Sequence, residues 1–404
     1  MFVKRRIEIN ESNLKSKKKM IKKFIIVTTG RSDYGMLKKL ANELEKDKNK
    51  KIVIVATGTH LSRKHGYTIN EINNDKFKNI LKINLNIRDD TKRNTASAIS
   101  NGIKKFYNIL SNTNPFLVIL LGDRYETFSF SIAANIFGVP IIHLHGGEVT
   151  SGSMDDTFRH CITKMSDIHF VANKVYKHRV IQLGENPNKV FNVGGLSLDN
   201  ISKKFFYNKN EIQRKLKLKF LKKNLIITFH PETINNSHNE KNLSIFLNSL
   251  SLLRDTLLIF TIPNADFGNY RIIKKINLFS KNRKNVKIFN SLGHIMYLSL
   301  VNQVDGVIGN SSSGLSEVPI LKKGSINIGK RQEGRLKPQS VISCKFNKEE
   351  IKKSIKKLYN KKFQAIVKKT KSPYGKKGAT KKILKILNKI DFKNIKYKKF
   401  FDIK

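Results

Sequence analysis

The sequence predicts an α/β protein made of two Rossmann-like, doubly wound domains with a central cleft. Short apolar runs alternate with stretches of helical spacing, which is typical of βαβ units around a parallel sheet. This alternation fills the first half of the chain, stops at a polar, lysine-rich stretch and then begins again. In addition, 404 residues exceed the length at which one hydrophobic core keeps growing, so two domains are expected.

The elements of the first half follow from their apolar patterns. Residues 116–121 are continuously apolar, as expected of a parallel strand with both faces buried. Residues 95–110 place Ile99, Ile103 and Phe106 on one helical face. The predicted strands are 24–29, 52–56, 79–87, 116–121, 139–143, 168–172 and 190–194, and the predicted helices are 34–44, 95–110, 125–137, 156–166 and 173–183.

The second half repeats the pattern after the lysine-heavy stretch. Its predicted strands are 225–229, 257–262, 286–289, 305–309 and 325–328, and its predicted helices are 243–253, 270–279, 293–301, 314–321 and 379–390. We therefore divide the chain into a basic N-terminal extension expected to be disordered (1–20), a first domain (21–200), a linker (201–223), a second domain (224–375), and a C-terminal helix crossing back to the first domain with a basic tail (376–404).

A net charge of +49 would by itself favour a nucleic-acid partner. The excess is nearly all lysine, however, and it is spread along a chain that is also rich in Asn and Ile, as expected of an AT-rich genome. No nucleic-acid-binding module and no basic stripe interleaved with aromatic residues is visible. We therefore predict no nucleic-acid partner, and a surface that attracts anionic small molecules.

Cysteine content and hydropathy point to the cytoplasm. Cys161 and Cys344 are the only cysteines and lie far apart in sequence, which argues against a disulfide framework and fits a reducing compartment. No run of about 20 apolar residues is present, so no membrane association is predicted.

Three clusters of charged residues in the first half follow or end apolar runs. Residues 122–126 (Gly-Asp-Arg-Tyr-Glu) follow the strand 116–121, and residues 143–148 (His-Leu-His-Gly-Gly-Glu) end the next strand. Residues 155–160 (Asp-Asp-Thr-Phe-Arg-His) begin a helix. Because an open α/β sheet binds ligands at the carboxyl ends of its strands, these clusters predict one site.

Pairing within the helical segment that contains these four charged residues is also expected. Asp155 with Arg159, and Asp156 with His160, are spaced to meet on one helical face. Two surface salt bridges of little energetic value are the alternative interpretation.

The glycine-rich turn at residues 28–35 matches neither common nucleotide motif. It lacks G-x-G-x-x-G, so no nicotinamide cofactor is predicted, and Met36-Leu37 stands where a P-loop has Lys and Ser/Thr. Arg31 remains as a partner for a phosphate or a nucleobase, with a plain tight turn as the alternative.

The second half offers an anion site at residues 309–314 (Gly-Asn-Ser-Ser-Ser-Gly), where a strand ends and a helix opens. Small residues allow a close backbone approach, and free N–H groups at a helix start favour phosphate. Together with Glu317, Arg331 and Arg335 the motif predicts a diphosphate cradle with an acceptor for a sugar hydroxyl. A serine-rich helix cap is the simpler alternative.

Histidines complete the set of candidates. His230 follows the strand 225–229 directly, which places an imidazole at the edge of the predicted cleft. His143 and His145 alternate along a strand and point to opposite faces, so they are not expected to share a metal ion, and no metal site is predicted.

Taken together, these motifs resemble the hydrolysing UDP-N-acetylglucosamine 2-epimerase family, in particular the branch that forms N-acetylmannosamine for sialic acid synthesis. The motifs that carry the resemblance, in chain order, are residues 122–126, 145–148, 155–164, 230–233 and 309–314. The likeness spans roughly residues 21 to 390.

The resemblance implies a glycosyltransferase-B type fold, with the nucleotide held mainly by the second domain and the chemistry between the domains. It implies a small-molecule nucleotide-sugar substrate and no cofactor. We also expect a homo-oligomer, either a dimer or a tetramer.

By the same resemblance, the catalytic residues are Asp123, Glu148, Asp155 and His230. The expected substrate and UDP ligands are Arg31, Arg124, His145, Asp156, Arg159, Ser311, Ser312, Ser313, Gly314, Glu317, Arg331 and Arg335. Two positions stay open: either Asp155 or Asp156 is the catalytic carboxylate, and the ribose contact is placed at Glu317 or Val318.

Three other functions fit parts of the sequence. An enzyme of the same type acting on UDP-N,N'-diacetylbacillosamine for legionaminic acid synthesis shares every motif. A nucleotide-sugar glycosyltransferase would use the same fold, but the clustered carboxylates favour elimination and hydration over transfer. A basic nucleic-acid-binding protein would explain only the net charge.

Overall fold

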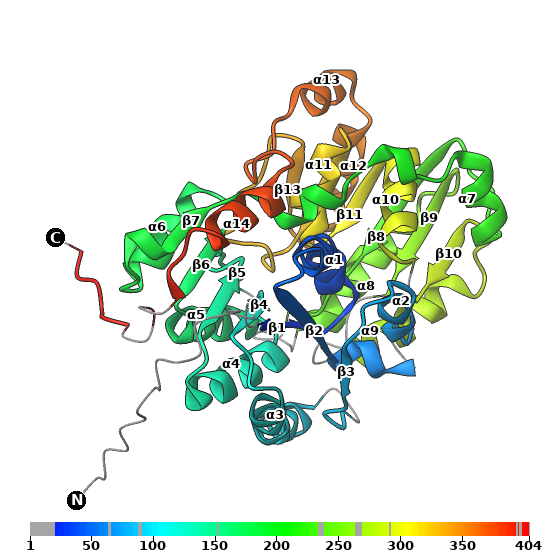
Figure 1. The fold of residues 1–404 in the computed structure, drawn as a ribbon. Coiled ribbons are helices and arrows are strands. Elements are labelled where there is room, and N and C mark those ends of the chain that lie inside the picture. The colour runs from blue at the N-terminus through cyan, green and yellow to red at the C-terminus, as the bar shows by residue number, and fades with distance from the viewer. Residues whose placement is uncertain are drawn as a thin grey trace, which may run out of the picture.

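Two parallel sheets organise the chain, as the fold class predicted from sequence requires (Figure 1). The computed structural model describes residues 21–63, 66–87, 91–151, 153–232, 238–262, 269–290, 292–392, 395 and 398–403. The predicted N-terminal extension (1–20) lies outside the described residues.

The first sheet has seven strands in the order β3-β2-β1-β4-β5-β6-β7, and every pairing is parallel. Its elements are β1 (Lys22–Thr28), α1 (Arg31–Glu45), β2 (Lys50–Thr57), α2 (Ile69–Asn74), β3 (Ile80–Ile83), α3 (Lys92–Thr113), β4 (Leu117–Leu121), α4 (Tyr125–Phe137), β5 (Ile141–Leu144), α5 (Asp155–Met165), β6 (Ile168–Val171), α6 (Lys174–Gln182) and β7 (Val190–Asn192).

The second sheet has six parallel strands in the order β10-β9-β8-β11-β12-β13. In chain order, the elements after β7 are α7 (Lys209–Leu216), β8 (Lys223–Thr228), α8 (Asn239–Leu250), β9 (Thr256–Thr261), α9 (Asn269–Ser280), β10 (Val286–Phe289), α10 (His294–Gln303), β11 (Gly306–Gly309), α11 (Ser313–Ile320), β12 (Gly324–Ile328), β13 (Val341–Cys344), α12 (Lys348–Leu358), α13 (Lys361–Lys369) and α14 (Ala379–Leu387).

Both sheets start at a central strand, build outward to one edge, and then restart beside the first strand. The order therefore reverses between β1 and β4 and again between β8 and β11. In doubly wound sheets, ligands bind at these switch points, outside the carboxyl ends of the strands. The topology thus sets one candidate ligand edge in each half.

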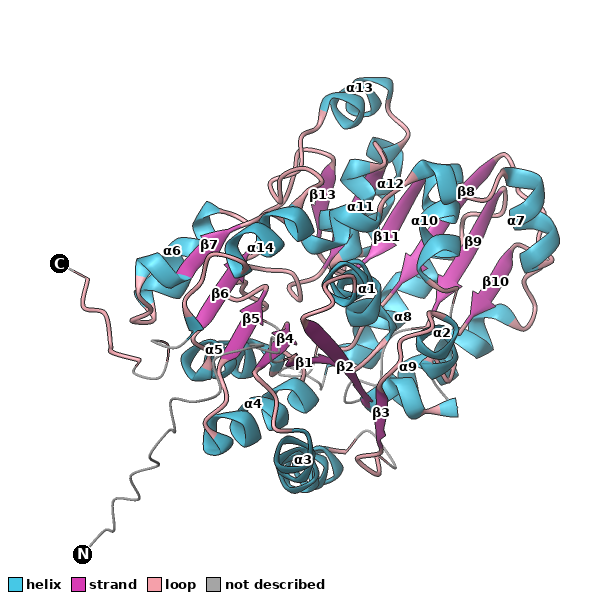
Figure 2. Cartoon of the chain, viewed as in Figure 1, coloured by secondary structure: helices cyan, strands magenta, loops and turns pink. Residues whose placement is uncertain are grey.

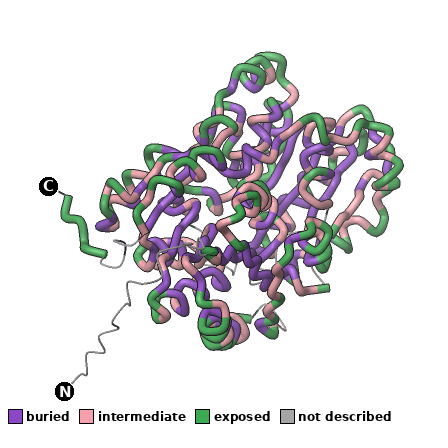
Figure 3. Tube along the Cα trace, viewed as in Figure 1, coloured by how far each residue is buried: buried purple, intermediate pink, exposed green. Residues whose placement is uncertain are grey.

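Each sheet separates two apolar layers, and helices cover both faces (Figures 2 and 3). In β1, Phe24 and Ile26 join one core cluster, while Ile25 and Val27 join another on the opposite face. Successive strand side chains alternate between faces, so a strand with both faces covered must be apolar throughout. This is why the continuous apolar runs identified the strands correctly.

The last helix, α14, packs against the first sheet rather than the second. Its Ala379, Ile383 and Leu387 are buried in the same core as Leu40 and Leu44 of α1. Asp199 accepts hydrogen bonds from the backbone N–H groups at the start of α14, which fixes where the helix begins.

Several elements were not predicted from sequence: α2, α7, β13, α12 and α13. Helix α7 lies within the stretch predicted as a linker, and it begins with a capping box formed by Asn208 and Glu211. Only Ile212 of α7 is buried, so its periodic signal was too weak to recognise. Helix α12 did carry a signal, since Ile351, Ile355 and Leu358 recur at helical spacing.

Two further properties bear on the sequence predictions. Cys161 and Cys344 are both free thiols. Within the described ranges, no helix combines the length and the apolar composition that a membrane span needs.

Candidate active site

A cleft of about 1690 Å³, part of it open to bulk solvent, lies between the two halves. Strand ends of both sheets contribute to its lining, as the two switch points require. Every site residue predicted from sequence lines this cleft except Asp156 and Gly314: the lining ones are Arg31, Asp123, Arg124, His145, Glu148, Asp155, Arg159, His230, Ser311, Ser312, Ser313, Glu317, Arg331 and Arg335.

Arg159 organises the carboxylates of the first wall. It is almost fully buried and ion-pairs with Asp123, which follows β4, and with Asp156 at 2.7 Å. It also donates to the backbone oxygen of Glu148 at 2.9 Å and to the hydroxyl of Thr150 at 2.9 Å. One buried guanidinium therefore ties together the ends of β4, the loop after β5 and the start of α5.

The predicted pairing of Asp155 with Arg159 was wrong, because Arg159 bonds to Asp156 instead. The Asp155 carboxylate accepts a hydrogen bond from Ser153 at 2.9 Å and faces the cleft. Asp156 does meet His160, at 3.7 Å, as the spacing predicted. The first turn of α5 thus separates its two carboxylates, one toward the cleft and one behind it.

Asp156 is held as an anion behind the cleft wall. Burial alone would raise its pKa, but His160, the Thr150 N–H at 2.6 Å and Arg159 lower the pKa of Asp156 to about 2. These contacts suit a carboxylate that supports Arg159 and the loop before α5.

Glu148 is buried, and both of its oxygens are engaged. Nδ1 of His145 lies 3.0 Å from Oε1, and Nη2 of Arg335 lies 2.9 Å from Oε2. Burial would raise the pKa of Glu148, but Arg335 and His145 lower it to about 2. Nε2 of His145 accepts from the backbone N–H of Leu196, so the proton of a neutral ring must sit on Nδ1 and point at Glu148.

His143 does not line the cleft. It is fully buried, and its ring nitrogens contact the Gly122 carbonyl at 2.8 Å and the Thr163 hydroxyl at 3.1 Å. Burial lowers the pKa of His143 to about 3. Within the described residues, no cluster of three His, Cys, Asp or Glu side chains is arranged to hold a metal ion.

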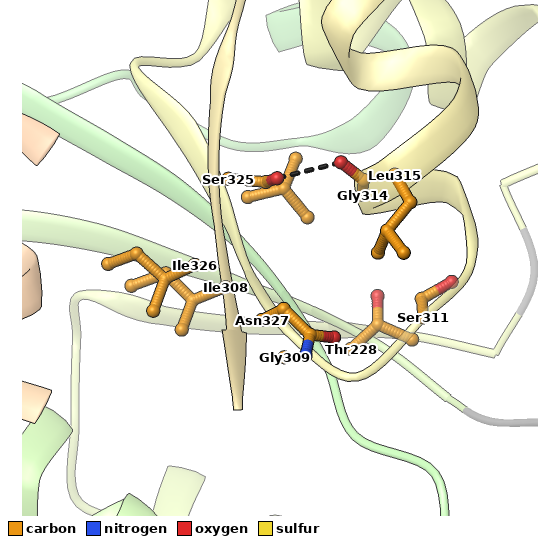
Figure 4. Close-up of a pocket in the computed structure, with 10 residues that line it drawn as sticks. Thr228, Ile308, Gly309, Ser311, Gly314, Leu315, Ser325, Ile326 and Asn327 are labelled. Atoms are coloured by element: carbon orange, nitrogen blue, oxygen red, sulfur yellow. Dashed lines mark hydrogen bonds between the residues drawn. The ribbon is translucent and has the colours of Figure 1, made fainter. Parts of the chain in front are cut away.

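The second wall is built around the start of α11. Ser311, Ser312 and Ser313 line the cleft there, and the hydroxyl of Tyr297 donates to Ser313 at 2.8 Å. Gly314 instead faces a small pocket between α11 and strands β11 and β12, where its carbonyl accepts from Ser325 at 2.7 Å (Figure 4).

Gly309 is required by the close packing beneath this loop. It has φ of +144°, and a Cβ there would lie 1.8 Å from the carbonyl oxygen of Thr228 in β8. Only glycine fits such an approach. β11 can therefore end close against β8 and place the serines at the switch point.

Asn310 connects the parts of this wall. Its side chain bonds to both backbone groups of His230, at 2.7 and 2.8 Å. Its carbonyl accepts from Arg331 at 3.2 Å and from Gln332 at 2.8 Å. The sequence analysis included Asn310 only as one residue of the serine motif and gave it no role of its own. Contacts that span about 80 residues leave no local signal in the sequence.

The cleft also contains residues to which the sequence analysis gave no role, including Asp33, His294, Tyr297 and Tyr374. Asp33 lies in the first turn of α1, two residues after Arg31. Burial raises the pKa of Asp33, although the Thr29 hydroxyl, 2.5 Å away, opposes the shift. For Arg31, burial is the largest influence and lowers its pKa. The glycine-rich turn therefore delivers an arginine and a carboxyl to the cleft.

Where the sequence analysis left a choice, the geometry distinguishes the candidates. Asp155 lines the cleft and Asp156 does not; likewise Glu317 lines it, while Val318 is buried in the apolar core. Met36, which stands where a P-loop would have its lysine, also lines the cleft.

Comparison with known proteins agrees with this architecture. Residues 42–388 match the family described as UDP-N-acetylglucosamine 2-epimerase. The chain is 38% identical to the Campylobacter jejuni GDP/UDP-N,N'-diacetylbacillosamine 2-epimerase (hydrolyzing), over 85% of this chain and 89% of that protein. It is 37% identical to the Escherichia coli polysialic acid biosynthesis protein P7, over 95% of this chain and 98% of that protein.

Among solved structures, the fold matches the Neisseria meningitidis UDP-GlcNAc 2-epimerase bound to UDP-GlcNAc, with a TM-score of 0.76 and 18% identity. That match covers 91% of this chain and 100% of the Neisseria chain. It supports a glycosyltransferase-B-like arrangement of two parallel sheets. From the family match and the two relatives, this chain belongs to the UDP-N-acetylglucosamine 2-epimerase family.

Proposed function

We propose that this protein is a hydrolysing 2-epimerase that converts UDP-N-acetylglucosamine to N-acetylmannosamine and UDP for sialic acid synthesis. The observation that carries the proposal is a cleft with carboxylates on one wall and a helix N-terminus with arginines on the other. A nucleotide sugar has a diphosphate for the second wall and a pyranose for the first.

The chemistry explains why both walls are needed. C2 of the sugar has no neighbouring carbonyl, so its proton cannot leave through a simple enolate. Cleavage of the C1–O bond must lead, and the developing oxocarbenium ion then acidifies the C2 proton. Departure of UDP with that proton leaves a glycal, and addition of water across its double bond gives the manno product.

Stabilisation of departing UDP falls to the second wall. The N–H groups at the start of α11, beside Ser311, Ser312 and Ser313, favour negative charge. Arg331 lies on the same wall and Arg31 faces it from α1. Fixed positive groups in a partly desolvated cleft stabilise the diphosphate as its charge develops.

Proton transfer falls to the first wall. Glu148 lines this wall and is ionised at neutral pH, since its pKa is about 2, so it carries the negative charge that a proton acceptor needs. Asp33, whose pKa is raised by burial, lines the same cleft. Asp123 and Asp155 face the same space and complete the acid and base groups needed for hydration.

A second substrate, UDP-N,N'-diacetylbacillosamine, is favoured by a specific observation. The Campylobacter relative named for it is as similar as the Escherichia relative named for polysialic acid synthesis, at 38% against 37% identity. The two sugars differ in substituents away from C1 and C2, so the same walls would perform the same reaction on either.

The test is incubation with UDP-N-acetylglucosamine in deuterated water, with UDP-N,N'-diacetylbacillosamine in a parallel reaction. We expect free UDP and a manno product that carries deuterium at C2. Deuterium in a sugar still attached to UDP would indicate a non-hydrolysing epimerase. Transfer of the sugar to an acceptor without deuterium at C2 would indicate a glycosyltransferase.

The remaining expectations become part of the proposal. We place the enzyme in the cytoplasm, supported by its two free thiols. We also propose a dimer or tetramer, which light scattering of the purified protein would test.

A further inference from the structure

One segment of the second domain crosses to the first. This bridging segment, residues 329–337, follows β12, and three contacts join it to the first half besides that of Arg335. Glu333 accepts from Ser151 and Gly334 accepts from Arg179, each at 3.4 Å, and Leu336 donates to the Tyr176 hydroxyl at 3.4 Å. A Cβ at Gly334 would lie 2.5 Å from Cγ1 of Val149, so the Val149 side chain packs directly against the glycine.

The other end of the bridging segment belongs to the diphosphate wall. Arg331 and Gln332 both donate to the carbonyl of Asn310, which precedes the serine loop. The same asparagine holds the backbone of His230. Only three residues separate Arg331 from Arg335, so whatever orders the first arginine also restricts the second.

Arg335 forms an ion pair with Glu148, which lies 187 residues earlier in the chain. Its side chain is 13% exposed, and Nη2 lies 2.9 Å from Oε2 of Glu148. Because His145 holds the other oxygen at 3.0 Å, the carboxylate is gripped from both domains. Of these two partners, only Arg335 depends on how the domains are placed.

We propose that Arg335 is a positioning residue for Glu148: the second domain delivers its guanidinium to that carboxylate, which is held in its working place only while the bridging segment lies across the cleft. This inference rests on the proposed 2-epimerase function. A sugar that is still attached to UDP fills the diphosphate wall and would then meet an oriented Glu148. A sugar without the diphosphate leaves that wall empty and would not. Orientation of a reacting group by about 1 Å can be worth on the order of 100-fold in rate.

The charged and polar groups around Glu148 make the positioning role of Arg335 testable through the pKa of Glu148. The groups facing it are His145 from its own loop, Arg159 from α5, Arg335 from the second domain, and the hydroxyls of Tyr176 and Tyr374. Burial raises the pKa of Glu148, and Arg335 opposes it most strongly. Loss of Arg335 should therefore raise that pKa, and a base that must be ionised then loses activity at a higher pH.

The test compares Arg335→Met and Arg335→Lys with Arg179→Met, a control that touches the same segment but no carboxylate. For Arg335→Met we expect kcat to fall on the order of 100-fold and the acid limb of kcat/KM to move to higher pH. The affinity for UDP, measured by calorimetry, should stay within about threefold, because Arg335 does not act on the diphosphate. Arg335→Lys should recover part of kcat, and Arg179→Met should keep the wild-type profile.

Three results would overturn the inference. A UDP affinity at least about tenfold weaker with an unmoved acid limb would make Arg335 a diphosphate ligand. Unchanged kcat and an unchanged pH profile would leave it without a role in turnover. A wild-type enzyme that releases no UDP from either sugar would refute the proposed function as well, whereas an active wild type confines the failure to Arg335. Thermal unfolding of each variant checks that the fold is retained.

Discussion

Two neighbouring carboxylates at the start of α5 have different surroundings. Asp155 and Asp156 are consecutive, yet one faces the cleft and the other supports Arg159 from behind. Sequence analysis found the pair but could not choose between them, because the choice depends on where Arg159 points. That direction follows from the contacts of the Arg159 side chain with Asp123, the Glu148 carbonyl and the Thr150 hydroxyl.

Conservative changes at the cleft carboxylates should separate chemistry from folding. We expect Asp123→Asn, Glu148→Gln and Asp155→Asn each to lose most turnover while keeping the fold, because general acid–base groups contribute roughly 100- to 10,000-fold. UDP release from the nucleotide sugar measures turnover, and circular dichroism checks the fold. Near-wild-type activity in any one of them would remove that residue from the mechanism.

Asp156→Asn is the matched control for Asp155→Asn. We expect it to lower the melting temperature more than Asp155→Asn does, because the buried Arg159 loses an ionic partner. Its turnover should fall less, since Asp156 does not line the cleft. The opposite ranking of the two variants would assign the catalytic role to Asp156.

Strands and helices depend on a few close contacts at their ends. Gly309 lets β11 finish against β8, and Glu185 anchors the end of α5. The Glu185 carboxylate meets Lys164 of α5, His169 of β6 and Lys398 of the C-terminal tail, at 2.9, 2.9 and 2.7 Å. Lys398 also donates to backbone carbonyls at the end of α5.

Glycine substitutions should show that the close approach of β11 to β8 leaves no room for a side chain at residue 309. We expect Gly309→Ala to destabilise the protein far more than Gly138→Ala, although both glycines have positive φ. At Gly138 a Cβ would meet nothing within 4 Å, so the cost is the backbone strain alone, about 1 kcal/mol. Urea unfolding of both variants measures the difference, and equal losses would contradict the steric argument.

Stability should depend on pH through Glu185. Burial would raise its pKa, but His169, Lys398 and Lys164 lower the pKa of Glu185 to about 2. A depressed carboxyl pKa stabilises the fold above the unfolded value, about 4.3, and this contribution disappears as pH falls toward the folded value.

We therefore expect Glu185→Gln to cost roughly 3 kcal/mol at pH 7, because it leaves the partly buried Lys164 and Lys398 without their counter-charge. In thermal melts, the difference in stability between the wild type and Glu185→Gln should become smaller between pH 4.5 and pH 3. A gap independent of pH would mean that packing, rather than charge, is lost.

At the scale of the whole molecule, a lysine-rich exterior surrounds a cleft built for an anion. The net charge of +49 is distributed along the chain, and the motifs that determine the fold contain little of it. A long-range positive field raises the encounter rate of an anionic ligand without fixing its orientation. We therefore expect the charge to act on the rate of association, and the cleft residues to determine specificity.

Salt should separate these two contributions. We expect kcat/KM to fall steadily as ionic strength rises from 0.01 to about 0.15 M, where the Debye length shrinks to about 8 Å. kcat should change much less, because the bound substrate is shielded in the cleft. Binding of neutral uridine is the control and should be nearly independent of salt. Equal salt dependence for UDP and uridine would contradict long-range attraction.

From sequence alone came the fold class, most strands and helices, the candidate site residues and the family resemblance. These follow from local signals, since a buried parallel strand must be apolar and ligand residues collect where strands end. Only the tertiary structure decided which of Asp155 and Asp156 meets the cleft, and that Arg335 bonds to Glu148 rather than standing free. The Arg335–Glu148 pair joins residues of separate sheets, so its geometry arises only when the two folded halves pack against each other. The choice between Asp155 and Asp156 depends instead on contacts within the first half, where the buried Arg159 reaches Asp123 and Asp156.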